Sequence, residues 1–558
     1  MVFTPIQAFQ PEKETSMPTN TSRRNFFKNT GAVSAAAMLG GVGASLTACG
    51  GDSSTTLTST EQLNLTASEA VAALKAGKMT ATEYVTNLLN RAKSLSALNA
   101  MISIDESGAL TAAKQVDADR AAGKTLGVLA GLPIVVKDNI NTKGMKTTGG
   151  TSSLRNFQPK TNAPSVQKLL DAGAIILGKS NLHEWAFGIT TTNFTLGIDP
   201  ITKAANRPGK NPYDTSRIPG GSSGGTAIAV AARFAPAGLG TDTGGSTRVP
   251  ASFCGIAGFR PSVGDGAGQG RRYPDTATDA LPISTTRDTV GPMGRTVADL
   301  ALLDAVITGG AVPTAKALKG LKIGLPAAFW TDLDDSVRTV ADAAKKKLAD
   351  AGVVFVDADL VGIMALNDTM SFPIALHEPV AAIPAYLSAN SAPVTTVAQV
   401  QAGLASPDVV GAFGAIAGDV FAAAYAAAMV PNTGGRAQLQ KLYKDYFAAQ
   451  GVECVLFPTT LLPAPKIDVV EGSSAGKLPY TVGGVAKQTA RDTFGTCIFN
   501  TDPCTNAGIP SLSIPAGLTA GGLPVGMQID GPLGSDTHLL AIGMGIEAVW
   551  GSVKAPAI

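Results

Sequence analysis

The sequence predicts an α/β protein whose core is a large, parallel or mixed β-sheet. Two kinds of segment alternate along the chain: short apolar runs rich in β-branched residues, and longer stretches with apolar residues at helical spacing. Residues 131–140, GLPIVVKDNI, predict a strand that ends near Lys137. Residues 163–186 then predict a helix, a glycine stop and a buried strand at 174–177. Such alternation is typical of a sheet covered by helices.

The alternation continues on both sides of this segment. Thr66 and Thr80 have the residue type and position of N-caps for two early helices. A further helix is expected over 226–233, followed by a short strand. Another is expected over 335–351, between the apolar runs GLKIGLP and GVVFVDADL. Strand character returns in CVLFPTT and in the segment SLSIPAG…LPVGMQIDG, so the sheet extends into the C-terminal part of the chain.

One long region differs from the rest. Residues 366–450 are rich in alanine, carry helical patterns and show no clear strand. We interpret them as a helical insertion that could cover a site. Because no internal repeat occurs, we expect a single large domain over residues 61–552.

Composition excludes several classes of function. The chain has 558 residues, 15% of them charged, and a net charge of +2. No basic run with interleaved aromatic residues occurs, so nucleic-acid binding lacks its electrostatic signature. The 3 histidines are scattered and no C-x-x-C occurs, so we expect neither a metal nor another cofactor.

The N-terminal residues have a different character. The segment SRRNFFK precedes an uncharged stretch of small residues that ends in LTAC, at Cys49. Residues 1–49 therefore resemble a twin-arginine signal peptide of the lipoprotein type, in which Cys49 is lipidated. An ordinary cleaved signal and a membrane anchor are the alternatives, and Met17 is an alternative start. Residues 50–60 have the composition of a flexible tether. We expect an exported protein, periplasmic or at the outer surface, attached to a membrane only through Cys49.

Two cysteines of the C-terminal part leave a choice open. Cys497 and Cys504 could pair in an oxidising compartment. Two buried free thiols are the alternative.

Residues 218–225, IPGGSSGG, contain the G-x-S-x-G spacing of a hydrolase nucleophile elbow. An elbow follows a strand, whereas the residues before this segment have the composition of a loop. A Ser-His-Asp site also needs a histidine, and only His377 and His538 follow. Asp536 and His538 have the appearance of surface residues. An α/β-hydrolase esterase that depends on one of these histidines is therefore a disfavoured rival.

A second glycine–serine loop lies downstream, in residues 238–261. Gly244 and Gly245 precede Ser246, and successive small residues let backbone N–H groups converge where negative charge develops. With Lys137 at a strand end, the two loops form a candidate catalytic set. Taken alone, Lys137 is more typical of a surface lysine, and each loop is also compatible with a phosphate cradle or a structural turn.

Five segments together resemble the amidase signature family of serine hydrolases. From the N-terminus they are GLPIVVKDNI, GAIILGKSNLHEWAFG, RIPGGSSGGTAIAVAARFAPAGLGTDTGGSTRVPASFCGIAGFRP, RDTVGPMGRTVADLALLDAV and NAGIPSLSIPAGLTAGGLPVGMQIDG. This is the order in which the family has them. The resemblance covers roughly residues 60–550. It implies the amidase signature fold, a large, mixed, twisted sheet covered by helices on both faces, with the helical insertion over the site.

The resemblance also assigns roles to residues by motif. The family's catalytic lysine corresponds to Lys137, its bridging serine, held by a cis peptide, to Ser222, and its nucleophile to Ser246. The backbone of four residues would then form the oxyanion hole: Thr243, Gly244, Gly245 and Ser246. We interpret three further residues as supports that hold the loops: Ser223, Asp242 and Arg248.

The implied chemistry requires an uncharged lysine. The ordinary pKa of a lysine is about 10.4, so a working value near 7–8 requires roughly 4 kcal/mol of destabilisation of the ammonium. The apolar run before Lys137 is consistent with such burial, and Asp138, the next residue of the strand, should point to the opposite face. Lys137 would draw a proton from Ser222, which draws one from Ser246 as an acyl-enzyme forms.

Three segments outside the catalytic core resemble the arylacetamide branch, which includes mandelamide and indoleacetamide hydrolases: LHEWAFGITTTNFTLG, LASPDVVGAF and NTDPCTNAGIPSLSIPAG. We therefore expect hydrolysis of small aryl or alkyl amides. Peptide amides, anilides and carbamates are alternatives, because an export signal departs from that cytoplasmic branch. The same signal disfavours the A subunit of glutamyl-tRNA amidotransferase. An inactive amidase-like binding lipoprotein is an alternative of another class. A homodimer is left open.

Overall fold

The structure is a computed structural model that describes residues 56–196, 208–264, 270–467 and 476–558. The predicted signal peptide, its Cys49 and most of the predicted tether lie outside the described residues. Helix α1 (Ser59–Asn64) begins inside the range expected as tether, where Thr58 and Glu61 form a capping box. Regular structure therefore starts two residues before the expected domain boundary at residue 61.

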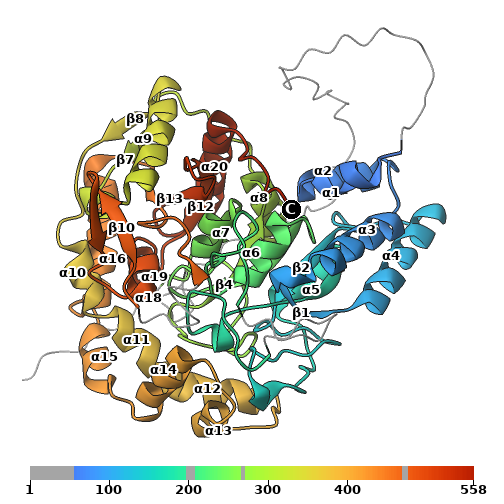
Figure 1. The fold of residues 1–558 in the computed structure, drawn as a ribbon, viewed down its shortest axis with the longest axis horizontal. Coiled ribbons are helices and arrows are strands. Elements are labelled where there is room, and N and C mark those ends of the chain that lie inside the picture. The colour runs from blue at the N-terminus through green and yellow to red at the C-terminus, as the bar shows by residue number, and fades with distance from the viewer. Residues whose placement is uncertain (1–55, 197–207, 265–269, 468–475) are drawn as a thin grey trace, which may run out of the picture. The chain divides into compact units, whose positions relative to one another are not determined.

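A mixed sheet of 11 strands forms the centre of the described part (Figure 1). The order is β1-β3-β2-β4-β6-β5-β12-β13-β9-β7-β8. Strand β2 is parallel to both β3 and β4, whereas β4, β6 and β5 pair antiparallel. The strands are β1 (Met101–Ile104), β2 (Pro133–Lys137), β3 (Ile175–Ser180), β4 (Ala237–Asp242), β5 (Ala257–Arg260), β6 (Thr289–Gly294), β7 (Lys322–Gly324), β8 (Val354–Val356), β9 (Cys454–Pro458), β12 (Ser511–Leu518) and β13 (Pro524–Asp530), with a separate hairpin of β10 (Pro479–Val482) and β11 (Val485–Gln488).

Helices cover both faces of this sheet. The strand alternation shows it in β5, where Phe259 packs in a core cluster with apolar residues of α8, α9 and α20, whereas Gly258 lies against Ala251 of α7. The helices outside the insertion are α2 (Ala67–Lys75), α3 (Ala81–Ser94), α4 (Glu106–Ala121), α5 (Pro164–Asp171), α6 (Gly224–Ala231), α7 (Arg248–Cys254), α8 (Val297–Thr308), α9 (Asp335–Asp350), α18 (Thr493–Cys497), α19 (Asp502–Ala507) and α20 (Asp536–Trp550).

The sequence expectations for these elements are confirmed with small shifts at the ends. Thr66 and Thr80 cap α2 and α3, each through a capping box. Strand β2 ends at Lys137, and α6 begins at Gly224, two residues before the expected start. The surface placement of Asp536 is wrong: it is 1% exposed, and its carboxylate accepts hydrogen bonds from the backbone N–H and the hydroxyl of Ser262.

The predicted helical insertion is also helical in the structure, with no strand anywhere in residues 366–450. Its helices are α10 (Ile363–Asp368), α11 (Ser371–His377), α12 (Pro379–Ala389), α13 (Val397–Gln401), α14 (Pro407–Ala417), α15 (Ala422–Ala428) and α16 (Gly435–Gln450). Helices α11 to α15 lie together in the lower left part of Figure 1, whereas α10 and α16 lie higher on the left side.

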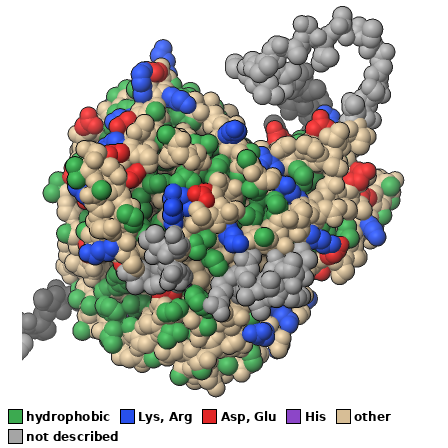
Figure 2. Space-filling model, in the orientation of Figure 1, with side chains coloured by type: hydrophobic (Ala, Val, Ile, Leu, Met, Phe, Trp, Pro, Cys, Tyr) green, Lys and Arg blue, Asp and Glu red, His purple; other side chains and the backbone are tan. Residues whose placement is uncertain are grey.

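The insertion carries exposed apolar side chains, which gather at the lower left of Figure 2. They include Phe372, Val410, Val420 and Val430. Within the described residues no single helix has the length and composition of a membrane span. Helices α14 and α15, bent by 80° at their junction, meet those criteria only as a pair.

Candidate active site

Lys137 lies at the carboxyl end of β2, in the interior of the sheet, and is fully buried. Its Nζ lies 2.8 Å from Ser222 Oγ and 2.7 Å from Thr241 Oγ1. Burial lowers the pKa of Lys137 to about 7, although the more distant charges of Asp242 and Asp288 favour the ammonium. A substantial fraction of this amine is therefore neutral near pH 7.

The loop that carries Ser222 packs tightly before α6. The peptide bond between Gly221 and Ser222 is cis, and the Ser222 carbonyl accepts the backbone N–H of His183 at 3.1 Å. The next residue, Ser223, fastens the loop to β4: its hydroxyl donates to the Thr241 carbonyl at 3.1 Å and accepts the Thr241 N–H at 3.2 Å. These bonds hold the Ser222 hydroxyl against the lysine.

The loop that carries Ser246 connects β4 to α7. Its turn needs glycine at residue 245, where φ is +129° and a side chain would collide with Thr501. Ser246 is 9% exposed and borders a cavity. The two serine loops touch, because the Ser223 N–H donates to the Ser246 carbonyl at 3.2 Å.

The carboxylate of Asp242 anchors the loop that carries Ser246. Its carboxylate accepts the backbone N–H groups of Gly245 and Thr247, at 3.0 and 3.1 Å, and two N–H groups of Arg248 at 2.9–3.0 Å. Burial would raise the pKa of Asp242, but the guanidinium groups of Arg248 and Arg260 hold it below its ordinary value. All three charged groups are fully buried, so loss of Asp242 would remove the carboxylate that both guanidinium groups contact.

The predicted oxyanion hole needs one correction. The N–H of Gly245 donates to Asp242, so it does not point freely into the cavity. The N–H groups of Thr243, Gly244 and Ser246 donate no hydrogen bond within the described residues. Arg287 Nε donates to the Thr243 carbonyl at 2.9 Å. Because the C=O and N–H of one peptide unit point in opposite directions, this bond turns the Gly244 N–H away from Arg287.

The structure brings the predicted site residues together, but no hydrogen bond joins the Ser246 hydroxyl to that of Ser222. Lys137 and Ser222 are in hydrogen-bond contact, and the loops of Ser222 and Ser246 are adjacent. The Ser246 hydroxyl itself makes no hydrogen bond to a protein group in the described part of the chain. The histidines of the rival esterase lie elsewhere: His377 pairs with Asp419 and His538 with Glu453, both at 2.6 Å.

The cysteines form no disulfide within the described residues, and Cys504 Sγ accepts a hydrogen bond from Arg248 at 3.0 Å. Four cysteines lie in the described ranges, and all of them are buried free thiols: Cys254, Cys454, Cys497 and Cys504. Of the two pairing alternatives left open, the structure has separate thiols at Cys497 and Cys504.

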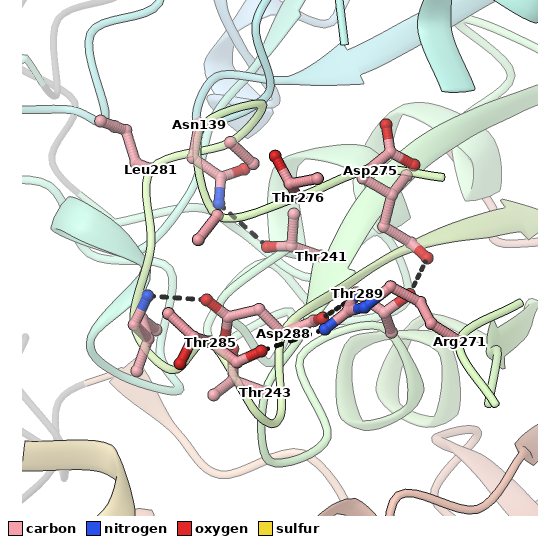
Figure 3. A pocket seen from close by; sticks show the side chains of 14 residues that line it. Asn139, Thr241, Thr243, Arg271, Asp275, Thr276, Leu281, Thr285, Asp288 and Thr289 are labelled. Carbon is pink, nitrogen blue, oxygen red and sulfur yellow. Dashed lines mark hydrogen bonds between the residues drawn. The ribbon is translucent and has the colours of Figure 1, made fainter. Parts of the chain in front are cut away.

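Sequence reasoning missed Thr241, Arg287 and Thr501. Thr241 Oγ1 contacts Lys137 and also accepts from Asn139 at 3.0 Å. Thr241 and Asn139 also line a small cavity of about 30 Å³, large enough for a water molecule (Figure 3). Arg287 and Thr501 hold the carbonyls of Thr243 and Gly244. Arg287 begins the segment RDTVGPMGR, one of the five that resemble the family. That resemblance could have identified Arg287 as a site residue.

A larger cavity of about 350 Å³ opens beside Ser246. Most of its lining is apolar, including three phenylalanines and the aliphatic residues Ile189, Ile283, Leu376 and Ile498; the phenylalanines are Phe187, Phe372 and Phe494. Helices α11 and α14 of the insertion form part of its wall, so the insertion covers the site. An apolar cavity with few polar groups beside a serine suits a small organic substrate.

Known proteins are similar to this chain in sequence and in fold. Residues 83–540 match the Amidase family. A mandelamide hydrolase from Pseudomonas putida is 38% identical over 504 residues, 88% of this chain and 92% of that protein. An indoleacetamide hydrolase from Agrobacterium vitis is 39% identical over 467 residues, 83% of this chain and 92% of that protein. The crystal structure of a peptide amidase from Stenotrophomonas maltophilia superimposes with a TM-score of 0.70 at 28% identity, covering 88% and 98% of the two chains.

The family match spans most of the chain, and the eleven-stranded sheet with its surrounding helices is the architecture of amidase signature enzymes. The chain therefore belongs to the amidase signature family and is an amidase, a hydrolase that acts on amide C–N bonds.

Proposed function

We propose that this amidase cleaves small arylacetamide-type amides with Ser246 as nucleophile, Ser222 as proton relay and Lys137 as base. The observation that carries the proposal is the contact of 2.8 Å between the Ser222 hydroxyl and a buried lysine whose pKa is lowered to about 7. A neutral amine can accept a proton, whereas an ammonium cannot.

The first half-reaction forms an acyl-enzyme. Ser246 Oγ attacks the amide carbonyl as its proton passes to Ser222 Oγ, whose own proton passes to Lys137 Nζ. Ser246 Oγ and Ser222 Oγ come within hydrogen-bond distance when the substrate is bound and attacked. Negative charge develops on the carbonyl oxygen, and the N–H groups of Gly244 and Ser246 are available to stabilise it.

The first half-reaction ends when Lys137 gives its proton back through Ser222 to the leaving nitrogen and the C–N bond breaks, which releases ammonia or an amine and leaves the acyl-enzyme. In the second half-reaction, water attacks the ester carbonyl and loses a proton along the same route; the proton then returns to Ser246 Oγ as its bond to the acyl group breaks, and the carboxylic acid leaves. Asp242 and Arg248 touch no reacting atom in this scheme; they position the nucleophile loop.

The apolar cavity supports an aryl acyl group. Phe187, Phe372 and Phe494 offer ring faces and edges, and aromatic pairs of this kind are stabilised beyond the burial of area. The two relatives named above hydrolyse mandelamide and indoleacetamide, whose acyl groups carry an aromatic ring, which favours the same class here.

A peptide amide is the second candidate. The fold matches that of a peptide amidase. Anilides and carbamates of the same family, and a non-catalytic binding role, would be separated by the same substrate panel: phenylacetamide, a peptide amide, an anilide and an aryl carbamate.

The test uses Ser246→Ala and a fluorophosphonate probe. Wild-type protein should hydrolyse phenylacetamide fastest of the panel and should be labelled by the probe, and Ser246→Ala should lose both. Ser388→Ala is the control, because Ser388 is an exposed serine of α12 that does not line the cavity; that variant should still be labelled. Labelling of Ser246→Ala at the wild-type level would refute the nucleophile.

For the location we propose an exported lipoprotein anchored through Cys49. The support is the sequence of residues 1–49 alone. Expression of the full chain with Cys49→Ala should move the protein from the membrane fraction to the soluble exported fraction. An unchanged distribution would refute the lipid anchor.

A further inference from the structure

A threonine hydroxyl is the second group in contact with the Lys137 amine. Thr241 belongs to β4 and is buried, and its Oγ1 lies 2.7 Å from Lys137 Nζ, as near as the Ser222 hydroxyl. The backbone of Thr241 is held separately, because its N–H and its carbonyl both bond to the Ser223 hydroxyl. Thr241 therefore meets the base with its side chain and the loop of Ser222 with its backbone.

The direction in which Lys137 accepts a proton depends on this contact. A neutral amine has N–H groups that donate and a single lone pair that accepts. The proton relay requires that the lone pair face Ser222 Oγ, so an N–H must face Thr241 Oγ1. If the Thr241 hydroxyl donated its own proton to Nζ, it would occupy the lone pair that Ser222 needs. Thr241 must therefore act as an acceptor toward the lysine.

Asn139 limits the directions that the Thr241 hydroxyl can take. Its Nδ2 donates to Thr241 Oγ1 at 3.0 Å (Figure 3). Within the described residues the Thr241 hydroxyl accepts from Lys137 and Asn139 and donates to no protein group. The Oδ1 of Asn139 is buried and has no protein partner in the same part of the chain. One hydroxyl proton and one buried acceptor are thus left to be satisfied, and such groups are normally hydrogen-bonded.

The small cavity of about 30 Å³ offers both groups the same partner. Thr241 and Asn139 both line it, and its volume holds a water molecule, which needs at least two polar partners. A water that accepts the Thr241 O–H and donates to Asn139 Oδ1 closes a ring of three hydrogen bonds with the bond from Asn139 Nδ2 to Thr241. In that ring the hydroxyl proton points away from the lysine, and a lone pair of Oγ1 faces it.

We propose that Thr241, held by Asn139 and a buried water molecule, is a positioning residue that turns the lone pair of Lys137 toward Ser222. The inference rests on the proposed function, since it assumes that Lys137 is the base. Thr241 keeps its own proton throughout the reaction. It accepts an N–H from the amine before proton transfer and from the ammonium afterwards, so the hydrogen bond persists while the Ser222 proton moves.

The experiment compares two substitutions of Thr241. Thr241→Val keeps the branched shape and removes the hydroxyl, whereas Thr241→Ser keeps the hydroxyl and removes the methyl group. Thr241→Val should lower kcat for phenylacetamide by about tenfold or more, with little change in KM, and Thr241→Ser should stay within about threefold of wild type. A residue that only fills space would give the reverse order. Thr289→Val is the matched control and should keep wild-type kcat, because Thr289 lines the same cavity but its hydroxyl donates to the Val290 carbonyl.

The pH profile adds a readout that loosened packing moves the other way. An acceptor stabilises the ammonium, so its loss in Thr241→Val should shift the midpoint of kcat/KM to lower pH. A loosened site that admits water would shift the midpoint to higher pH, because burial is what lowers the pKa of Lys137. Asp242 and Asp288, the carboxylates whose charge acts on this amine, are present in both variants.

Asn139→Leu tests the ring of hydrogen bonds. It should lower kcat in the wild-type background and cause no further loss in Thr241→Val, because the ring acts only through the Thr241 hydroxyl. A crystal structure of the wild-type protein should show a water within hydrogen-bond distance of Thr241 Oγ1 and Asn139 Oδ1. A map without that water, or additive losses in the double variant, would overturn the ring.

The two Thr241 variants decide the positioning role even if Asn139→Leu fails to fold, which circular dichroism detects. Wild-type kcat in Thr241→Val, together with an inactive Lys137→Met enzyme, would overturn this inference and leave the proposed function standing. Wild-type kcat in Lys137→Met would refute both, because Lys137 would then not be the base.

Discussion

Two lysines on neighbouring strands are both fully buried, but different groups surround their amines. Lys137 of β2 and Lys179 of β3 are both fully buried, and the register places Lys179 opposite Val136, one residue from Lys137. Lys179 Nζ donates to the carbonyl of Ile140 at 2.6 Å and lies 3.7 Å from the carboxylate of Asp138. In contrast, the hydrogen bonds that Lys137 Nζ makes within the described residues all go to hydroxyls, those of Ser222 and Thr241.

The difference shows how one sheet keeps a structural cation and a reactive amine side by side. Burial lowers the pKa of Lys179 only to about 8, because Asp138 stabilises the ammonium. Burial lowers the pKa of Lys137 further, to about 7, since no carboxylate touches it. The alternation of side chains explains this: Asp138 points away from Lys137, as the sequence predicted, and the structure places it beside Lys179. The four predictions below test this contrast.

The largest expected effect is on catalysis. Lys137→Met should lower kcat for phenylacetamide by about 10²–10⁴, the loss typical of a missing general base. Circular dichroism should show an unchanged fold. Lys78→Met, at an exposed lysine, is the control and should keep wild-type activity. A Lys137→Met enzyme with a tenth or more of wild-type kcat would break the comparison.

The same substitution should stabilise the protein, by an amount that depends on pH. The folded pKa of Lys137 lies below the ordinary value of a lysine, so the unfolded chain binds the extra proton between about pH 7 and 10.5. Wild-type stability therefore rises with pH across that window. Lys137→Met lacks this group and should gain most below pH 7, by up to about 5 kcal/mol. Denaturant titrations at pH 6 and pH 10 measure it; a gain independent of pH would contradict the assignment.

Lys179→Met should act in the opposite direction. It leaves Asp138 buried without its cation, which typically costs about 3–5 kcal/mol. The double variant Asp138→Asn, Lys179→Met should recover part of that loss, because both charges are then gone. Chemical denaturation of the single and double variants gives the coupling free energy. Equal stability of wild type and Lys179→Met would remove the structural half of the contrast.

The smallest expected effect is the pH dependence of activity. Only the neutral form of Lys137 accepts a proton, so kcat/KM should rise about tenfold per pH unit below a pKa near 7 and level off above it. Lys179 should leave no inflection of its own. A profile that stays flat between pH 5 and pH 9 would show that the titration of Lys137 does not limit the reaction.

Much of the scaffold around this pair could be predicted from local patterns. The end of β2 at Lys137, the caps at Thr66 and Thr80, and the helical insertion all follow from residue types within a few positions of each other. The positions of Ser222 and Ser246 followed from the family resemblance, because glycine-rich loops alone are compatible with several functions.

The partners of these residues could not be predicted in the same way. Arg287 and Thr501 hold the loop of Ser246 by contacts with residues 44 and 257 positions away in the sequence, and Asp408 reaches the cavity from the insertion. Asp536 has the residue type of a surface position, yet it is buried because Ser262 supplies its hydrogen bonds. Local periodicity contains no information about which distant segments meet.

By itself, then, the sequence determined the order of strands, helices and loops, because near neighbours set periodicity and turn chemistry. The charge of its two buried lysines was decided only by the tertiary structure. Desolvation depends on every atom packed around an amine, and the balance between Lys137 and Lys179 depends on which of them a carboxylate can reach.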